Sequence, residues 1–225
     1  MLTIEDERDI LEQGYPIIVP LLIDEYDGDF EIEAYSEIAD IAEEFHSHFF
    51  GHFFSKRAID WLDAKLRPYV ENKGYLRECT GKYRWYDRFE ARESDRLAHN
   101  RILDSTHMLD TGDYELLVSF SLAEQLEKGL PTFVTLDGDK IVSIATVNEH
   151  ADDQKMLEIT VETAPSYRGK GYALSNTVAL AEYLIDRGFF VTYACSRYNR
   201  PSRGLARKTG FEDAGRFYAY TAYKL

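Results

Sequence analysis

The chain has little cysteine and no long apolar run, and these two features limit the classes of protein to which it can belong. Cys79 and Cys195 are the only cysteines among 225 residues, too few for the disulfide framework of a small secreted domain. No apolar run approaches the roughly 20 residues that a membrane-spanning helix needs. The segment Met1 to Glu7 has neither a basic stretch nor an apolar signal core. We therefore expect a cytoplasmic protein with no membrane association.

Basic residues are scarce in the first two thirds of the chain. The sequence carries 26 Lys and Arg against 40 Asp and Glu, a net charge of −14. Residues 151–225 hold 11 of the basic and 8 of the acidic residues, which leaves 15 and 32 for residues 1–150. An acidic segment of this kind repels nucleic acid and attracts a cationic partner, although it also simply keeps a protein soluble.

Three familiar site motifs are missing. The sequence contains neither the Walker pattern nor a Gly-x-Gly-x-x-Gly dinucleotide fingerprint with its acidic residue. His48 and His52 stand four residues apart, so they would share one helix face, but the residues between them do not make the His-Glu-x-x-His zinc pattern. We expect an aromatic helix that packs on the other domain here, and no metal in the protein.

Residues 1–96 are predicted to form a mostly helical segment, to which no function is assigned. Thr3 can cap a first helix that carries Ile4, Ile10 and Leu11, and two prolines break the chain after it. Apolar residues recur at helical spacing in Glu33 to Phe50 and in Ser55 to Val70.

Residues 97–225 show a different pattern, an alternation of strands and helices. His107 to Glu127 is predicted to be partly helical. Asp137-Gly138 between two β-rich runs indicates a hairpin. The further predicted elements are a strand over Lys155 to Thr163, a helix over Tyr172 to Arg187, a buried strand over Phe189 to Cys195, a helix over Ser202 to Thr209 and an aromatic strand over Phe217 to Tyr223. This order implies a mixed α/β sheet, and the aromatic last strand could form the edge of a homodimer.

A Gly-rich turn joins the first of these strands to its helix, with the sequence Arg168-Gly169-Lys170-Gly171-Tyr172-Ala173. Two glycines let the backbone approach a ligand, and the free amides at the start of a helix favour a phosphate. Arg168 and Lys170 add positive charge. A lone Gly-x-Gly is also found where a helix entry simply needs small residues.

The sequence around this turn resembles the signature of the GNAT superfamily of acetyl-CoA-dependent N-acetyltransferases. The Gln/Arg-x-x-Gly-x-Gly/Ala core is matched by Arg168, Gly171 and Ala173, and Asn199 to Phe211 resembles the second motif of that family. The resemblance covers about Thr132 to Leu225. It implies a GNAT acyltransferase fold of class α/β (α+β), a mixed and mostly antiparallel sheet flanked by helices, with residues 1–96 as a helical extension. The second motif is most similar to the branch that includes the zwittermicin-resistance acetyltransferase.

The resemblance also implies where acetyl-CoA binds. The strand before the turn splays from its neighbour and pairs with the pantetheine arm, while the turn holds the pyrophosphate. Lys208 could approach a phosphate or be a solvated helix residue. The implied cofactor-binding residues are Val161, Glu162, Thr163, Arg168, Gly169, Lys170, Gly171, Tyr172, Ala173, Asn199, Ser202 and Lys208.

The chemistry requires a base to deprotonate the amine. Glu158 is the first candidate and Glu162 the second, since both lie on the polar face of the predicted strand; each could instead face solvent or bind the substrate cation. The Tyr that protonates the leaving thiolate in many family members is replaced by Ala206. Tyr218 or Tyr198 could take its place, or no acid is used. Cys195 is expected to be a buried, inert thiol.

These observations favour an enzyme that acetylates the amine of a cationic small molecule. A protein or peptide N-acetyltransferase and a non-catalytic acyl-CoA-binding regulatory module stay open as alternatives. The acidic first part argues against nucleic acid as a partner.

Overall fold

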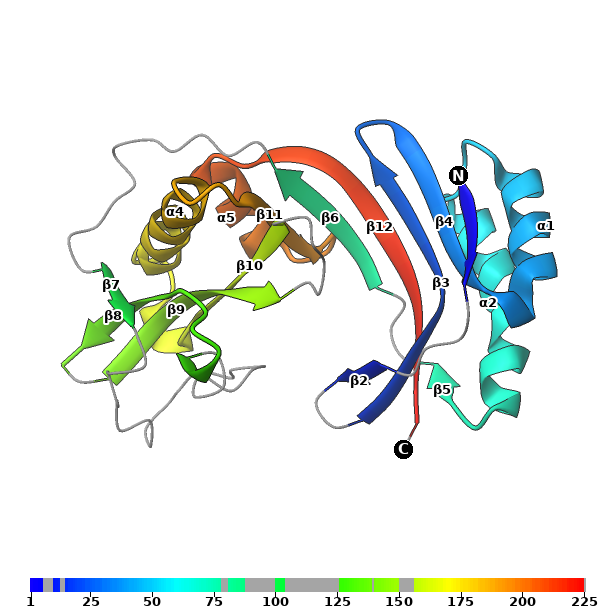
Figure 1. Ribbon diagram of the computed structural model, residues 1–225, viewed down its shortest axis with the longest axis horizontal. Helices are drawn as coiled ribbons and strands as arrows, with labels where there is room; N and C mark the ends of the chain where they lie inside the picture. The colour runs from blue at the N-terminus through cyan, green and yellow to red at the C-terminus, as the bar shows by residue number, and fades with distance from the viewer. Residues whose placement is uncertain are drawn as a thin grey trace. The chain divides into compact units, whose positions relative to one another are not determined.

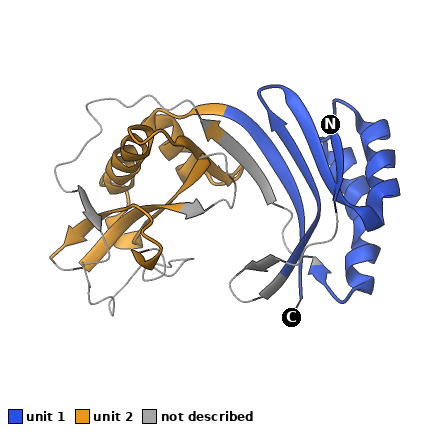
Figure 2. Cartoon of the chain, viewed as in Figure 1, with its two compact units in different colours: residues 1–84, 214–225 blue, residues 85–213 orange. Residues whose placement is uncertain are grey.

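The computed structural model describes residues 1–5, 10–12, 15–77, 81–87, 100–103, 126–138, 140–149 and 156–224. The chain divides into two units (Figures 1 and 2). Unit 1 comprises Met1–Arg84 together with Ala214–Leu225, and unit 2 comprises Trp85–Asp213. Unit 1 therefore takes a strand from the end of the chain, so the two units are not consecutive blocks of sequence. The helix predicted over His107 to Glu127 lies outside the described residues, except for positions 126 and 127.

Unit 1 is built on a twisted sheet in the order β1-β4-β3-β12. Strand β1 pairs with β4 in parallel, and the other pairs are antiparallel. Two short strands extend it, since β2 pairs with β3 and β5 with β12. A further strand, β6, follows β5 in the chain and is the neighbour of β12 in the strand order. The bounds are β1 Leu2–Glu5, β2 Ile10–Glu12, β3 Tyr15–Tyr26, β4 Asp29–Tyr35, β5 Leu76–Arg77, β6 Gly81–Asp87 and β12 Glu212–Tyr223.

The strands at the start of unit 1 contradict the prediction of a first helix followed by a break at the prolines. The described residues from Leu2 to Tyr26 lie in strands, and β3 runs through Pro16 and Pro20. Pro20 is tolerated because the register between β3 and β12 shifts at that point, where a ladder hydrogen bond is not required. The neighbouring amide of Val19 is satisfied by the hydroxyl of Tyr35 at 3.2 Å.

The two later helices of the segment are confirmed. They are α1 (Ala39–Phe49), entered through the 3-10 turn η1 (Ser36–Ile38), and α2 (Lys56–Asn72). Ser55 caps α2 by accepting a hydrogen bond from the amide of Ala58 at 3.2 Å, and α2 continues through Pro68. Both helices cover one face of the sheet (Figure 1), where Phe45, Leu62 and Leu66 are fully buried.

The second sheet, in unit 2, has the order β11-β10-β9-β8-β7. Strands β10 and β11 are parallel and the other neighbours antiparallel, as expected for a mixed, mostly antiparallel sheet. The predicted hairpin is present, and Gly138 in its turn has φ +61°. The bounds are β7 Asn100–Leu103, β8 Thr132–Asp137, β9 Lys140–Glu149, β10 Met156–Thr163 and β11 Phe190–Ser196.

Helix α4 (Tyr172–Ile185) packs on this sheet, and α5 (Arg200–Thr209) packs against α4 and β11. The α4 residues Val178, Ala181 and Leu184 are buried, as their spacing predicts. Gly210, with φ +101°, ends α5. Within the described ranges, no helix is both long and apolar enough to span a membrane.

Strand β12 is not the exposed edge suggested for a homodimer. It pairs with β3 from Gly215 to Tyr223, and in the strand order it lies between β3 and β6. Its aromatic residues Tyr218 and Tyr220 are fully buried in the core of unit 1. The aromatic composition that suggested an interface therefore reflects packing inside the unit.

Candidate active site

The parallel strands β10 and β11 of unit 2 are paired over only part of their length. Three positions pair, the last being Glu158 with Thr192. Beyond it β10 continues to Thr163 and stays paired with β9 on its other side, while β11 continues to Ser196. The strands thus separate after Glu158 and leave backbone groups of β10 facing an opening, as the family resemblance implies.

The Gly-rich turn follows β10 and has the geometry of an anion site. After the 3-10 turn η4 (Pro165–Tyr167), Gly169 adopts φ +79° and Gly171 adopts φ +85°, in the left-handed region that favours glycine. Gly171 is the residue before α4, and among the described residues no side chain caps that helix. A Cβ at Gly169 would meet no atom within 4 Å. The first amides of α4 are therefore available to a ligand that approaches the turn.

The two cations of the turn are positioned differently. Arg168 donates from Nε to the carbonyl of Thr163 at 3.1 Å, which ties the turn to the end of β10. Lys170 Nζ lies 4.6 Å from the ring centre of Tyr167, and the Tyr167 hydroxyl donates to Asp137 at 2.6 Å. Arg168 lines the cleft described next, and Lys170 does not.

A cleft of about 750 Å³ joins the strand opening to the turn and to α5, all within unit 2. It is lined by the end of β10, the turn and the first residues of α4, one residue of β11, and α5 with the residue before it. The lining residues are Val161, Glu162, Thr163, Tyr167, Arg168, Gly169, Gly171, Tyr172, Ala173, Leu174, Tyr193, Asn199, Arg200, Pro201, Ser202, Gly204, Leu205 and Lys208. Every cofactor-binding residue predicted from the sequence is among them except Lys170.

The second motif holds the start of α5 at the cleft. Asn199 precedes α5, and its Oδ1 accepts a hydrogen bond from the amide of Ser202 at 3.1 Å. Ser202 Oγ lies 2.7 Å from the hydroxyl of Tyr193 on β11. Asn199 therefore fixes the backbone of Ser202, while Tyr193 contacts its side chain.

The two candidate bases occupy different places on β10. Glu162 lines the cleft. Glu158 lies at the last position paired with β11, outside the lining residues. Leu157, Ile159 and Val161 belong to the apolar core of unit 2, so both carboxylates fall on the opposite face of the strand, as the alternation predicts.

The tyrosines proposed as replacement acids do not line the cleft. Tyr218 is buried in the core of unit 1, and Tyr198 follows β11 with 71% of its surface exposed. Ala206 is buried in the core of unit 2. Sequence reasoning missed Tyr193, because it shares a face of β11 with the buried residues Val191 and Cys195 and so has the pattern of a core residue.

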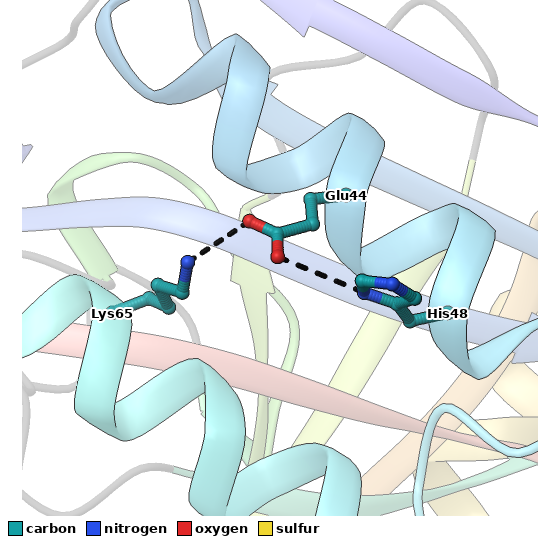
Figure 3. A network of polar contacts seen from close by, with 3 residues as sticks. All are labelled: Glu44, His48 and Lys65. Atoms are coloured by element: carbon teal, nitrogen blue, oxygen red, sulfur yellow. Dashed lines mark hydrogen bonds and ion pairs between the residues drawn. The ribbon is translucent and has the colours of Figure 1, made fainter.

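The histidine stretch packs as an aromatic cluster of unit 1. The ring of His46 stacks on Phe53 with centroids 5.7 Å apart, and Phe45 contacts Phe49 at 5.3 Å. His48 Nδ1 lies 3.8 Å from Glu44, which also binds Lys65 at 2.9 Å (Figure 3). The described residues contain no group of three His, Cys, Asp or Glu side chains placed to hold a metal ion.

Cys195 is buried with 6% of its surface exposed and is not in a disulfide. Burial raises the pKa of its thiol, an effect that Ser202 and Arg203 oppose. A neutral buried thiol is a weak nucleophile.

A smaller cavity of about 350 Å³ lies in unit 1 over strands β1, β4, β3 and β12. Its wall is apolar apart from two carboxylates and a tyrosine. The lining residues are Glu5, Val19, Leu22, Glu33, Ala34, Tyr35 and Ala219.

Comparisons with known proteins identify the family of the chain. A family model described as GNAT acetyltransferase matches residues 106–223, and no curated protein matches the chain. Among solved structures, a GNAT-family acetyltransferase from Novosphingobium aromaticivorans has 12% identity and a TM-score of 0.54, over 68% of either chain. A GCN5-related N-acetyltransferase-like protein from Streptococcus suis has 18% identity and a TM-score of 0.51, over 98% of this chain and 88% of its own. At these identities the structures support the fold, and the family match supports the chemistry. The chain belongs to the GNAT acetyltransferase family and is an acyltransferase.

Proposed function

We propose that the protein transfers the acetyl group of acetyl-CoA to the primary amine of a cationic small molecule. The observation that carries the proposal is the uncapped start of α4 behind Gly169 and Gly171, opening into a cleft of about 750 Å³. A helix start of this kind binds phosphate oxygens, and the separated strands beyond it offer backbone groups to an extended arm.

The described residues fit the parts of acetyl-CoA in order along the cleft. The amides of Gly169 to Ala173 would hold the pyrophosphate, with the positive charge of Arg168 and Lys170 close by. Val161, Glu162 and Thr163 would pair with the pantetheine arm on one side, and Asn199 and Ser202 would line it on the other. Lys208 lines the same cleft and would approach a phosphate.

The acidic balance of residues 1–150 favours a cationic acceptor. This part has 15 basic and 32 acidic residues, and its negative charge raises the local concentration of cations. The cavity of unit 1 has the same character, because Glu5 and Glu33 line it and, within the described part of the chain, no Lys or Arg does. The same balance argues against nucleic acid and against an anionic membrane surface.

A carboxylate of β10 would remove the proton of the amine. When bound, acetyl-CoA supplies a thioester carbonyl that the neutral amine attacks. Glu162 already lines the cleft, and Glu158 stands where the strands separate. A base of this kind typically contributes about 10²–10⁴-fold to the rate. Replacement of Glu158 and Glu162 by Gln, one at a time, assigns the role by which variant loses the acidic limb of the pH–rate profile, where activity falls as the base becomes protonated.

Finer features follow the same proposal. We propose that the protein belongs to the branch that includes the zwittermicin-resistance acetyltransferase, which the form of the second motif from Ser202 to Phe211 supports, and that its compartment is the reducing cytoplasm. We propose that any homodimer uses a surface other than β12, because β12 lies between β3 and β6 in the strand order.

The proposal is tested by calorimetric titration with acetyl-CoA of the wild type, Gly171→Glu and Gly171→Ala. Both variants strain a backbone at φ +85°, but only Glu adds bulk and negative charge at the turn. Loss of two charge-assisted hydrogen bonds, each worth about 1.5–3 kcal/mol, predicts binding weaker by roughly 100-fold or more in the Glu variant. Gly171→Ala should lose much less.

A folded wild type that does not bind acetyl-CoA would refute the proposal. If binding is confirmed, the acceptor is sought by following thiol release with pairs of compounds that differ only in an amine replaced by a hydroxyl. Release with cationic amines and not with their hydroxyl partners supports the substrate class. Activity with neutral amines alone would contradict it.

A further inference from the structure

The cleft of unit 2 contains a pair of hydroxyl groups to which the proposed function gives no chemical role. Tyr193 and Ser202 both line the cleft, and their oxygens lie 2.7 Å apart. Ala206 stands where many family members have the Tyr that assists the leaving thiolate, and it is buried away from the cleft. The leaving group therefore lacks the partner that the resemblance implies.

We propose that Ser202 Oγ–H donates a hydrogen bond to the sulfur that leaves acetyl-CoA, and that Tyr193 holds Ser202 in the orientation for this contact. The proposal rests on the proposed function, since it requires acetyl-CoA in the cleft. Ser202 is then a catalytic residue, and Tyr193 is a positioning residue that acts through it.

The place of Tyr193 on β11 supports the contact with sulfur. The last paired position of the parallel strands is Glu158 with Thr192, so Tyr193 is the first residue of β11 beyond the point of separation. A pantetheine arm that starts at the Gly-rich turn and lies along Val161 to Thr163 would end near this point, and its sulfur would lie at that end.

The direction of the hydrogen bond follows from burial. Tyr193 is only 2% exposed, and among the described residues Ser202 is its one hydrogen-bonding partner. If Ser202 donated to it, the phenolic hydrogen would be buried without an acceptor, at a cost of about 1–3 kcal/mol. Tyr193 therefore donates, and the hydrogen of the half-buried Ser202 is left for the cleft.

Both residues are held in place by contacts of their own. The ring of Tyr193 contacts two others, with its centroid 6.4 Å from that of Tyr86 and 5.8 Å from that of Phe211. The backbone of Ser202 is fixed by the hydrogen bond from its amide to Asn199 at 3.1 Å. A donor fixed in this way needs no reorganisation when charge develops on the sulfur.

The pair is suited to donating a hydrogen bond and not to releasing a proton. Burial raises the pKa of Tyr193 above its ordinary range, more than its bond to Ser202 lowers it. A thiol has a pKa near 8.5, so transfer of the phenolic proton to the thiolate is uphill. In the balanced step the nitrogen–carbon bond forms, one amine proton goes to the base, and the carbon–sulfur bond breaks with its electron pair on sulfur. The thiolate takes its proton from water after it leaves.

Neighbouring groups do not compete strongly for Ser202. Cys195 lies two residues along β11 and also faces Ser202, but burial raises its pKa and keeps it a neutral thiol, which is a weak acceptor. The negative charge of Glu158 raises the pKa of both Tyr193 and Cys195, while the positive charge of Arg203 lowers the pKa of Cys195.

The test measures the pKa of the thiol of bound CoA, from the ultraviolet absorbance of its thiolate. The same protein loaded with desulfo-CoA gives the baseline, which removes the signal of the protein's own thiols and phenols. A charge-assisted hydrogen bond predicts a thiol pKa below that of free CoA in the wild type. In Ser202→Ala the pKa should rise by about one to two units, and Ser202→Thr, which keeps the hydroxyl, should restore most of the shift.

Tyr193→Phe should raise the same pKa by less than Ser202→Ala does, because the donor persists but loses its support. Tyr183→Phe is the matched control: it also removes a tyrosine hydroxyl from unit 2, but Tyr183 does not line the cleft, and we expect no shift. The turnover number should fall about 10- to 100-fold in Ser202→Ala, with little change in the calorimetric affinity for acetyl-CoA.

Two outcomes would overturn the proposal while leaving the proposed function intact. One is an unchanged pKa of bound thiol in Ser202→Ala when CoA still binds, and the other is a Tyr193→Phe variant that matches Tyr183→Phe. Failure of the wild type to bind CoA is a different result, and it would refute the proposed function as well.

Discussion

Replacement of Gly215 by Ala should selectively destabilise unit 1. In β12, a Cβ built on Gly215 would lie 1.9 Å from the carbonyl oxygen of Glu25 and 2.9 Å from its carbonyl carbon. Both atoms belong to the backbone of β3, so no side-chain rotation relieves the overlap. The strands must move apart where Gly215 faces Tyr26 and where Asp27 donates to Ala214 at 3.1 Å.

The expected cost is the sum of overpacking and weakened hydrogen bonds. Overpacking of a core typically costs about 1–3 kcal/mol, and one or two strained backbone hydrogen bonds add about 1 kcal/mol each. We expect a loss of about 3 kcal/mol, which for a chain of this size lowers Tm by roughly 6–12 °C. Gly204→Ala is the control, because its Cβ would meet nothing within 4 Å and a helix gains up to about 1 kcal/mol from this change.

The assay is urea unfolding followed by tryptophan fluorescence. The sequence has two tryptophans, Trp61 and Trp85, so a Trp85→Phe background leaves Trp61 as a reporter within unit 1. Gly215→Ala should shift this transition to lower urea, while Gly204→Ala should not. A Gly215→Ala midpoint equal to that of its parent would show that β3 and β12 are not closely paired at this position, and would refute the reasoning.

The remaining predictions concern a cap, an ion pair and the tether of the turn. Asn199→Ala should cost about 0.5–2 kcal/mol in urea unfolding because α5 loses its cap, whereas Asn199→Asp keeps an acceptor and should lose little; equal losses would contradict the capping role. Lys73, with help from Tyr69, lowers the pKa of Glu37, so the ion pair stabilises the fold above the ordinary Glu pKa of about 4.3 and is lost as pH falls further. The acid limb of the stability curve should therefore be shallower in Lys73→Met than in the wild type, and parallel limbs would argue against the pair. Arg168→Lys keeps the charge but loses the bond to the Thr163 carbonyl, and we expect acetyl-CoA to bind about 10-fold more weakly by calorimetry; unchanged affinity would assign Arg168 a purely electrostatic role.

Much of unit 2 could be predicted from sequence because its signals are local. Asp137-Gly138 marks a tight turn, and the alternation from Leu157 to Glu162 marks a half-buried strand. The positive φ angles of Gly169 and Gly171 account for the glycines that the motif requires. The cleft gathers the residues of both motifs, although they are more than twenty positions apart in the chain.

The start of unit 1 was predicted wrongly because its strands depend on distant partners. Ile18 in β3 pairs with Ala222 in β12, and no local window contains both. The prolines of β3 were predicted to break the segment, because nothing nearby in the sequence indicates that Pro20 lies where the register between β3 and β12 shifts. Tyr193 was passed over for a related reason: on β11 it looks like one more core residue, and only the approach of α5 brings Ser202 to its hydroxyl.

The route of the chain through unit 1 has a consequence for its biogenesis and for dissection of the protein. During synthesis, residues 1–84 leave the ribosome long before β12 does, so their sheet must wait with β3 unpaired on one side while unit 2 is made. An unpaired strand edge invites association with other chains. If the chain were divided between residues 96 and 97, the first fragment would contain β3 without β12, and the second would contain β12 without β3. A circular permutant that places β12 directly before β1 would make unit 1 continuous, and it offers a way to express each unit as a separate folding body.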